Sequence, residues 1–577
     1  AWRRFLKHRL ALIGGTAAAM AQGGSPMNHL SPEGIHSARD LGAKADGVTD
    51  DTAAIQAAID RAAEKGGQVY LPPGRYLVAG SLQVKPGVAI VGAATAPLYI
   101  KPLIGTVVLA TGGRDNEDAP ALFELGDSSA VQGLTVFYPD QKPDDIHPYA
   151  WTFHLQGGDN TVENVTLINS YNAIRVGPEP NVRHRIRSVY GCALRRGVFV
   201  DACTDIGRVE NVQFHCHWWS APEVGGNWDP VFAFMWKNLE AFTFARTDWE
   251  YITNNFVFPT NIGYHFLATK NGACNGHLTA NGADAAQVCV QVDEIQPMGL
   301  LITNGQFVAF NGEDPTALVV NEQCGGQVRL VNCNFWGSFR RLAVLKGKSF
   351  VGFSDCYFSG WDARGEGLPA IDVQAGKLQL QGCSFVGRLA VRLGEKAQHA
   401  IVTGNNGSRG VRIEDLTGGK AILRDNELPP PPPQASKRYT LHVGADEDET
   451  CLSGDWHGAE PASDGPPGTT TARWSGAKCG LKLPVLPDTA YDLSVWLMVA
   501  KPDPTNSVSV AGGDAAKLDK PGLQQVRLQV PRALTAGKQA VEVAFSVKAW
   551  VPSKETPGSN DTRQLGVRVF AAEMVAR

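Results

Sequence analysis

A short pattern recurs through the middle of the chain at intervals of twenty-odd residues. Its aligned phenylalanines, Phe307, Phe335, Phe358 and Phe385, are 28, 23 and 27 residues apart. Each copy is a short run of alternating apolar residues, and a repeat of this length built from short strands is typical of one coil of a β-solenoid. Stacked coils bring like residues together at a strand spacing of about 4.8 Å. We therefore expect these phenylalanines to form a column inside a solenoid.

Weaker copies of the pattern extend the repeat in both directions. Upstream copies begin at Gly133, Asn164 and Asn211, and downstream copies contain Asn405 and Asn426. The repeat is interrupted between about residues 215 and 300, and a solenoid carries its function on outer faces and on such excursions. The sequence therefore predicts an all-β solenoid with an excursion in its middle.

The start of the repeat array has a helix signal. Asp50, Asp51 or Thr52 can N-cap a helix that places Ile55 and Ile59 on one face. Strand-like runs follow on both sides of a Pro-Pro-Gly turn at residues 72–74. A helix lying over the open end of a solenoid hides strand edges that would otherwise pair with other chains.

The stretch from Gly42 to Leu77, which contains Gly-Ala-Lys-Ala-Asp-Gly-Val-Thr-Asp-Asp-Thr and Leu-Pro-Pro-Gly, resembles the N-terminal signature of a known family. The family is the pectate-lyase superfamily of β-helix proteins, also described as glycoside hydrolase family twenty-eight-related. The resemblance covers residues 35–428 and implies a right-handed parallel β-helix, a single-stranded solenoid with an N-terminal capping helix. Relatives include lyases, hydrolases and tailspike-like proteins, so it also implies a polysaccharide substrate.

The regions outside the repeat have different compositions. Residues 1–21 resemble a signal peptide, with a cationic start and a short apolar run, which predicts a secreted or periplasmic protein. Residues 429–437 begin with five prolines and form a stiff linker. Period-two patterns over residues 438–577 predict a β-sandwich. This domain is either a carbohydrate-binding module or a packing and oligomerisation domain.

Composition excludes several classes of protein. The formal net charge of −4 argues against nucleic-acid binding, and no stretch is long and apolar enough to span a membrane. The 11 cysteines contain no CxxC pair and no zinc-ligand spacing, so we predict no metal site. Cys451 and Cys479 lie in the same C-terminal region and can form a disulfide.

Glycoside hydrolysis requires two carboxyl groups, about 5 Å apart in retaining enzymes and about 6.5–9.5 Å apart in inverting ones. Asp248 and Glu250 are two residues apart and share a face if they lie on a strand. Other acidic residues follow turns or repeat strands and converge on one flank if the coils stack in register. The predicted catalytic carboxylates are Asp248, Glu250, Asp284, Glu313 and Asp314.

The interruption of the repeat is rich in aromatic residues, whose rings can stack on the C–H faces of sugars. A loop composition around Trp228 predicts that its ring is accessible to solvent. Phe232, Phe234, Phe242 and Phe244, spaced two apart, are expected to fill the core. The predicted substrate-binding residues are His215, His217, Trp218, Trp219, Trp228, Trp249 and Arg246.

Three functions remain open. The leading hypothesis is a glycoside hydrolase without a cofactor, although the motif set of polygalacturonases is absent. The second is a polysaccharide lyase, for which the resemblance implies Ca²⁺ and for which the alternating Arg183, Arg185 and Arg187 form a ladder that can receive a uronate glycan. The third is a non-catalytic glycan binder or tailspike-like adhesin. Tailspike relatives are trimers, so a monomer and a trimer both remain possible.

Overall fold

The structure is a computed structural model that describes residues 34–577, except residues 100, 311, 365, 388, 430–432, 446–447, 557, 560 and 562. The predicted signal-like segment, residues 1–21, lies outside the described residues.

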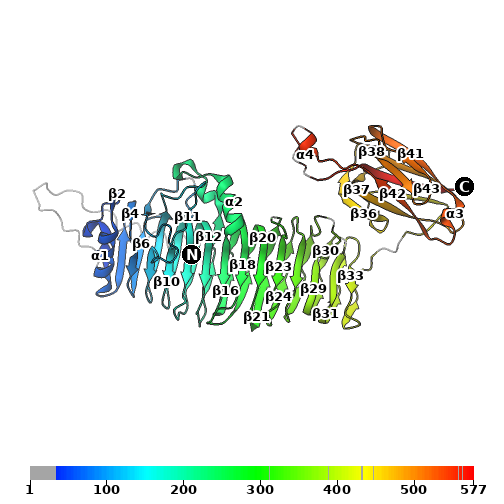
Figure 1. Cartoon of the computed structure of the whole chain (residues 1–577). Coiled ribbons are helices and arrows are strands. Elements are labelled where there is room, and N and C mark those ends of the chain that lie inside the picture. Colours follow the sequence, from blue (N-terminus) through cyan, green and yellow to red (C-terminus); the bar gives the residue numbers. More distant parts are fainter. Residues whose placement is uncertain are drawn as a thin grey trace, which may run out of the picture.

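A long parallel β-helix occupies the first part of the described chain (Figure 1). Its 34 strands pair with strands one coil away, which divides the helix into three parallel faces. Face A consists of β5 (Leu82–Val84), β8 (Phe123–Leu125), β10 (Trp151–Leu155), β15 (Glu240–Phe244), β18 (Thr260–Phe266), β23 (Thr316–Val320), β26 (Arg341–Leu345) and β33 (Arg412–Asp415). Face B consists of β1 (Ile35–Ser37), β3 (Gly67–Leu71), β6 (Val88–Gly92), β13 (Arg208–Glu210), β16 (Thr247–Thr253), β19 (Cys274–Thr279), β21 (Ile295–Thr303), β24 (Gln327–Val331), β27 (Phe350–Ser354) and β34 (Ala421–Arg424).

Face C completes the coil. It consists of β2 (Asp46–Asp50), β4 (Gly74–Val78), β7 (Thr106–Ala110), β14 (Gln213–His215), β17 (Phe256–Phe258), β22 (Gln306–Ala309), β25 (Asn334–Phe335), β28 (Tyr357–Ser359), β30 (Ser384–Val386) and β32 (Asn406–Gly407). Six long strands turn a corner and serve two or three faces, namely β9 (Ala130–Phe137), β11 (Thr161–Val176), β12 (Arg185–Val200), β20 (Gly282–Val292), β29 (Ile371–Gln381) and β31 (Leu389–Thr403). The chain runs through the faces in the order A, B, C in every complete coil.

The core is built from columns of like residues, as the repeat predicts. Phe307, Phe335, Phe358 and Phe385 pair in register on face C. Their rings stack with centroids 5.6, 5.1 and 4.8 Å apart. All four are buried, so the column forms the apolar interior that one coil cannot enclose alone.

Asparagines hold the corner between faces B and C. Asn255 and Asn281 are buried one coil apart, and the Nδ2 of Asn255 donates to the Oδ1 of Asn281 at 3.1 Å. The residue before each, Asn254 and Ala280, adopts a left-handed backbone conformation that turns the chain. Such ladders satisfy backbone groups that every solenoid corner leaves unpaired.

The helix α1 (Thr52–Ala63) covers the N-terminal end of the solenoid (Figure 1). Ile55 and Ile59 lie on the inner side of this helix and are fully buried, as expected. Asp51 occupies the N-cap position, but its carboxylate accepts hydrogen bonds from the backbone N–H groups of Lys44 and Ala45 at 2.6 and 2.9 Å instead of from the helix. Asp51 therefore fastens the preceding loop to the start of the helix.

The interruption of the repeat is shorter than expected. The coils resume at β15, and the excursion contains the 3-10 helices η2 (Cys216–Trp219) and η3 (Pro222–Val224) and the helix α2 (Trp228–Asn238). Phe242 and Phe244 are core residues of face A, as expected. Phe232 and Phe234 lie on α2 and are only half-buried. Residues two apart share a face on a strand but not on a helix.

The C-terminal part of the chain is a separate antiparallel β-domain of sandwich type with its own core. Its nine strands are β35 (Arg438–His442), β36 (Leu452–Pro461), β37 (Thr471–Pro484), β38 (Tyr491–Val499), β39 (Ser507–Val510), β40 (Ala515–Lys517), β41 (Gly522–Val530), β42 (Ala540–Ser546) and β43 (Arg568–Ala576). Cys451 and Cys479 are both buried in it without a disulfide between them, so the predicted bridge is not formed. None of the helices in the described part of the chain is long and apolar enough to cross a membrane.

Candidate functional site

Asp248 and Glu250 do not share a face, contrary to the expectation from their spacing. Trp249 between them has a left-handed backbone with φ of 60°, and the strand pairing shifts register between Thr247 and Glu250. This bulge leaves Asp248 partly exposed, turns Trp249 into solvent and buries Glu250.

Glu250 is fully buried against His184. Its Oε1 lies 2.9 Å from the Nε2 of His184, and its Oε2 accepts a hydrogen bond from the Thr247 hydroxyl at 2.6 Å. Burial by itself lowers the pKa of His184, but the charge of Glu250 raises it well above the usual value. A polysaccharide cannot reach this carboxylate, which corrects the prediction that Glu250 is catalytic.

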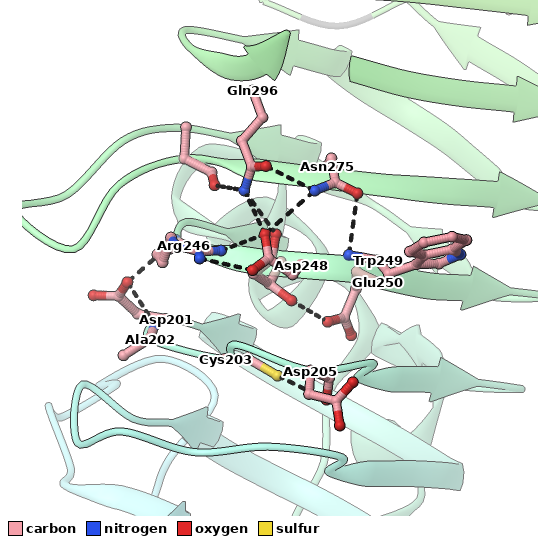
Figure 2. A network of polar contacts seen from close by, with 12 residues as sticks. Asp201, Ala202, Cys203, Asp205, Arg246, Asp248, Trp249, Glu250, Asn275 and Gln296 are labelled. Atoms are coloured by element: carbon pink, nitrogen blue, oxygen red, sulfur yellow. Dashed lines mark hydrogen bonds and ion pairs between the residues drawn. The ribbon is translucent and has the colours of Figure 1, made fainter. Parts of the chain in front are cut away.

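Asp248 belongs to a polar network at the corner between faces A and B (Figure 2). Its carboxylate accepts hydrogen bonds from Arg246 at 2.7 Å and from Gln296 at 2.8 Å, and Asn275 contacts it at 3.4 Å. Burial by itself raises the pKa of Asp248. The hydrogen bonds from Arg246 and Gln296 lower it by more, so the pKa of Asp248 lies below its usual value. Asp248 and the predicted substrate-binding Arg246 therefore satisfy each other, while the Trp249 ring, 56% exposed, stands outside the network.

The remaining predicted carboxylates lie at the opposite edge of face A. Asp284 follows the face C part of β20, and Glu313 and Asp314 lie in the loop between β22 and β23, one coil further on. The strand β18 separates this corner from that of Asp248 by seven residues, which is about 20 Å. The five carboxylates therefore do not converge on one flank.

These three acidic side chains differ in their partners. Asp314 forms ion pairs with Arg340 and Arg341, so it joins coils and is not a free carboxylate. Glu313 is exposed. Asp284 is half-buried, accepts a hydrogen bond from the backbone N–H of Ala285 at 2.6 Å, and has no ion pair with any described residue. Burial raises the pKa of Asp284, the direction that a proton donor requires.

Asp284 lies in an outward-facing row on face C. The inward residues Phe214, Val257, Ala283, Phe307 and Phe335 are paired coil by coil, and successive side chains of a strand point to opposite sides. The residues that follow them form what we call the face C row, namely His215, Phe258, Asp284, Val308 and Trp336, of which Val308 is buried. Along the axis of the solenoid, the carboxyl group of Asp284 thus lies between Phe258 on one side and Val308, followed by Trp336, on the other.

An aromatic cluster occupies the N-terminal end of the face C row. The ring of His215 stacks on Phe258 at 4.7 Å and lies 5.6 Å from the ring of Trp228, which α2 supplies. Tyr99 meets His217 edge-on at 4.8 Å. Trp228 is 39% exposed and Tyr99 47% exposed, so the cluster presents ring faces to solvent.

The two histidines of this cluster are uncharged at neutral pH. Burial lowers the pKa of His215 to about 3, assisted by the neighbouring His217, and lowers the pKa of His217 to about 4. The Nδ1 of His215 accepts a hydrogen bond from the backbone N–H of His217 at 3.1 Å. Neutral imidazoles beside aromatic rings suit sugar hydroxyl groups, to which they can donate or from which they can accept hydrogen bonds.

Trp218 and Trp219 do not take part in this exposed surface. Both are buried, and the indole N–H of Trp219 donates to the carbonyl of Val224 at 3.2 Å. Their rings support the 3-10 helix beneath the cluster, which corrects the prediction that they contact sugar. Of the predicted substrate-binding residues, His215, His217 and Trp228 are brought together, while Trp249 and Arg246 lie at the other corner of face A.

Sequence reasoning missed a second polar surface, on the outside of face A. His265 on β18 lies between two carboxylates, with its Nδ1 3.3 Å from Glu240 and its Nε2 2.8 Å from Asp293. Burial lowers the pKa of His265, but the hydrogen bonds to Asp293 and Glu240 outweigh this and raise it to about 9. The hydrogen bond from His265 and the nearby arginines lower the pKa of Glu240. In the sequence, the one sign of this surface is His265, a polar residue among the apolar neighbours of residues 263–266.

Other cations extend this surface toward the N-terminal coils. Arg175 pairs in register with His154 on one side and Phe199 on the other. The guanidinium of Arg196 lies over the ring of Trp151 at 5.9 Å, with its own side chain exposed. The Arg183, Arg185 and Arg187 ladder predicted for a lyase lies elsewhere, and Arg183 and Arg187 are already paired with acidic residues.

Comparisons with known proteins find a family that matches the N-terminal coils and several similar curated proteins. Residues 35–107 match the family described as rhamnogalacturonase A/epimerase, pectate lyase-like. The chain is 48% identical over 85 residues to the mannuronan C5-epimerase AlgE1 of Azotobacter vinelandii. The aligned part covers 13% of this chain and 6% of that protein. It is 47% identical over 140 residues to alginate lyase 7 of the same organism, covering 23% and 16% of the two chains.

The chain therefore spans a small part of the length of these curated relatives. Among solved structures, the N-terminal fragment of the bacteriophage phi29 gene product 12 aligns with a TM-score of 0.43 at 12% identity, covering 64% of this chain and 66% of that one.

Proposed function

Because the chain is a pectate-lyase-like parallel β-helix protein, we propose that it is a carbohydrate-active enzyme that hydrolyses a polysaccharide lying along the face C row. The observation that carries this proposal is the state of Asp284. It is a half-buried carboxyl group with a raised pKa, it has no ion pair among the described residues, and the exposed ring of Trp336 lies along the same row.

Asp284 acts as the general acid in this proposal. A carboxyl group whose pKa is raised keeps its proton to higher pH, and it can give that proton to the glycosidic oxygen while the bond to the sugar breaks. Glu313, which is exposed in the loop at the same corner, is the candidate base that takes a proton from the attacking water. The water oxygen then bonds to the anomeric carbon, and the leaving sugar departs with the proton from Asp284.

The aromatic side chains supply the binding surface. Trp228 and Phe258 stand on one side of Asp284, and Trp336, which is 46% exposed, stands two coils further along. Stacking on such rings buries apolar sugar faces without requiring a charged substrate. The named activities of the relatives, epimerisation of mannuronan and lysis of alginate, support a polysaccharide as the substrate class. We also propose that the protein acts outside the cytoplasm, because such polymers lie there.

The test is a product assay against a panel of neutral and acidic polysaccharides. Hydrolysis predicts new reducing ends without ultraviolet absorbance, and loss of at least 100-fold in kcat in Asp284→Asn. The matched control is Asp355→Asn, an exposed aspartate in a left-handed turn where asparagine is equally tolerated. Glycan binding without any product would instead indicate the non-catalytic binder.

A second function is favoured by the cations of face A. Arg175 and Arg196 lie on neighbouring coils beside the His265 group, and such a surface suits the carboxylates of a uronate glycan. A lyase acting there would release products that carry an unsaturated uronate and absorb in the ultraviolet. Its activity would fall in Arg196→Gln and be unchanged in Asp284→Asn, the reverse of the hydrolase pattern.

A further inference from the structure

A fully buried group of three different ligand types lies at the corner between faces A and B. His184 precedes β12, Cys203 lies in the turn after it, and Glu250 is in β16. These side chains come from three successive coils, and all three are completely excluded from solvent. Their ligand atoms all lie within 4.8 Å of one another, and this is the one such group of three or more among the described residues.

A glycine lies directly against this group. Gly207 lies in the coil between His184 and Glu250. A Cβ atom built on Gly207 would overlap both the imidazole of His184 and the carboxylate of Glu250. The absence of a side chain at Gly207 therefore lets two neighbouring coils bring an imidazole and a carboxylate together.

Both oxygens of Glu250 have hydrogen-bond partners in His184 and Thr247, but His184 and Cys203 are less completely paired. His184 Nδ1 is buried without a hydrogen-bond partner among the described residues. Cys203 Sγ contacts the carbonyl of Asp205 at 3.8 Å. Buried polar atoms are almost always paired, so an orphaned imidazole nitrogen beside a thiol and a carboxylate requires an explanation.

We propose that His184, Cys203 and Glu250 bind a divalent transition-metal ion, of which zinc fits the ligands best. Thiolate, imidazole and carboxylate are the three donor types that zinc uses in proteins. A thiolate and a carboxylate together neutralise a divalent cation, which suits a site without water. The Thr247 hydroxyl, 2.6 Å from Glu250 Oε2, orients the carboxylate from behind.

The ion ties three coils together beside the excursion. Cys274, also buried, continues the column of Cys203 and Thr247 by one coil. The site is separate from the face C row, on the other side of face A. Its role is structural, because no polysaccharide can reach fully buried ligands.

The experiment is a metal analysis of the full chain expressed in zinc-supplemented medium and dialysed against a chelator. The expected result is one zinc per chain, retained in Cys289→Ser, which removes a buried thiol elsewhere, and reduced at least fivefold in Cys203→Ser. Zinc content that is equal in wild type, Cys203→Ser and Cys289→Ser would overturn the proposal, as would wild-type protein that contains none.

Cobalt provides a second readout that survives if Cys203→Ser folds poorly. Wild-type protein refolded with Co²⁺ is expected to show thiolate-to-cobalt charge-transfer absorbance, and Glu250→Gln, which keeps the shape of the side chain, should shift the cobalt d–d bands. Refolded wild type that shows neither band, with the same thermal stability with and without Co²⁺, would contradict the site.

Discussion

Asp284 is a half-buried carboxyl group that has no ion pair with any residue that the structure describes. Because burial raises its pKa, ionisation at neutral pH costs stability, and the folded state is favoured when the group is protonated. We predict that Asp284→Asn raises the free energy of unfolding at pH 7 by about 0.5–1.5 kcal/mol while it abolishes turnover. Denaturant unfolding alongside the product assay measures both. A variant that loses activity and stability together would make Asp284 a structural residue.

His265 also makes the stability of the fold depend on pH. Its pKa is raised by carboxylate partners, whereas the pKa of Asp284 is raised by burial. The folded-state pKa of His265, about 9, lies above the unfolded value, so its ion pairs with Glu240 and Asp293 stabilise the fold fully below about pH 6.5. The contribution is lost as the pH rises through 9. We predict that His265→Gln costs about 1–3 kcal/mol at pH 6 and much less at pH 10. His277→Gln on face B is the matched control, and a cost for His265→Gln that is independent of pH would contradict the assignment.

At the scale of single elements, the phenylalanine column tests the solenoid. Phe335 is buried between Phe307 and Phe358, and its truncation leaves a cavity that the neighbouring coils cannot close. We predict that Phe335→Ala costs about 3–5 kcal/mol, with loss of hydrogen-exchange protection in the adjacent coils. Tyr357→Ala, at an outward position of the next coil, should cost less than about 1 kcal/mol. Equal costs would mean that the column is not the core.

The sequence predicted those elements whose signal is local or repeated. The phenylalanine spacing predicted the column, and the apolar periodicity at Ile55 and Ile59 predicted the capping helix. The prediction that Asp248 and Glu250 point to the same side of the strand was wrong, because residue spacing does not reveal the bulge at Trp249. The partners of His265 were not predictable, because Glu240, His265 and Asp293 come from different coils and meet only through strand register.

At the scale of the whole molecule, the two β-domains have separate cores. The core of the β-helix ends at Val411 and that of the antiparallel domain begins at Leu441. We predict that a fragment of residues 438–577 unfolds cooperatively by itself, and that residues 34–428 retain the activity of the full chain on a soluble oligosaccharide. Circular dichroism melting of the first fragment and kcat of the second measure this. An unfolded C-terminal fragment, or an inactive β-helix that is correctly folded, would contradict it.

In the proposed complex, a glycan lies along the face C row with Asp284 at the reacting bond. The most direct measurement is a crystal structure of the inactive Asp284→Asn protein with a bound oligosaccharide from the best substrate. We predict sugar rings stacked on Trp228 and Trp336, with the glycosidic oxygen within hydrogen-bond distance of residue 284. An oligosaccharide bound instead across face A, against Arg175 and Arg196, would contradict it.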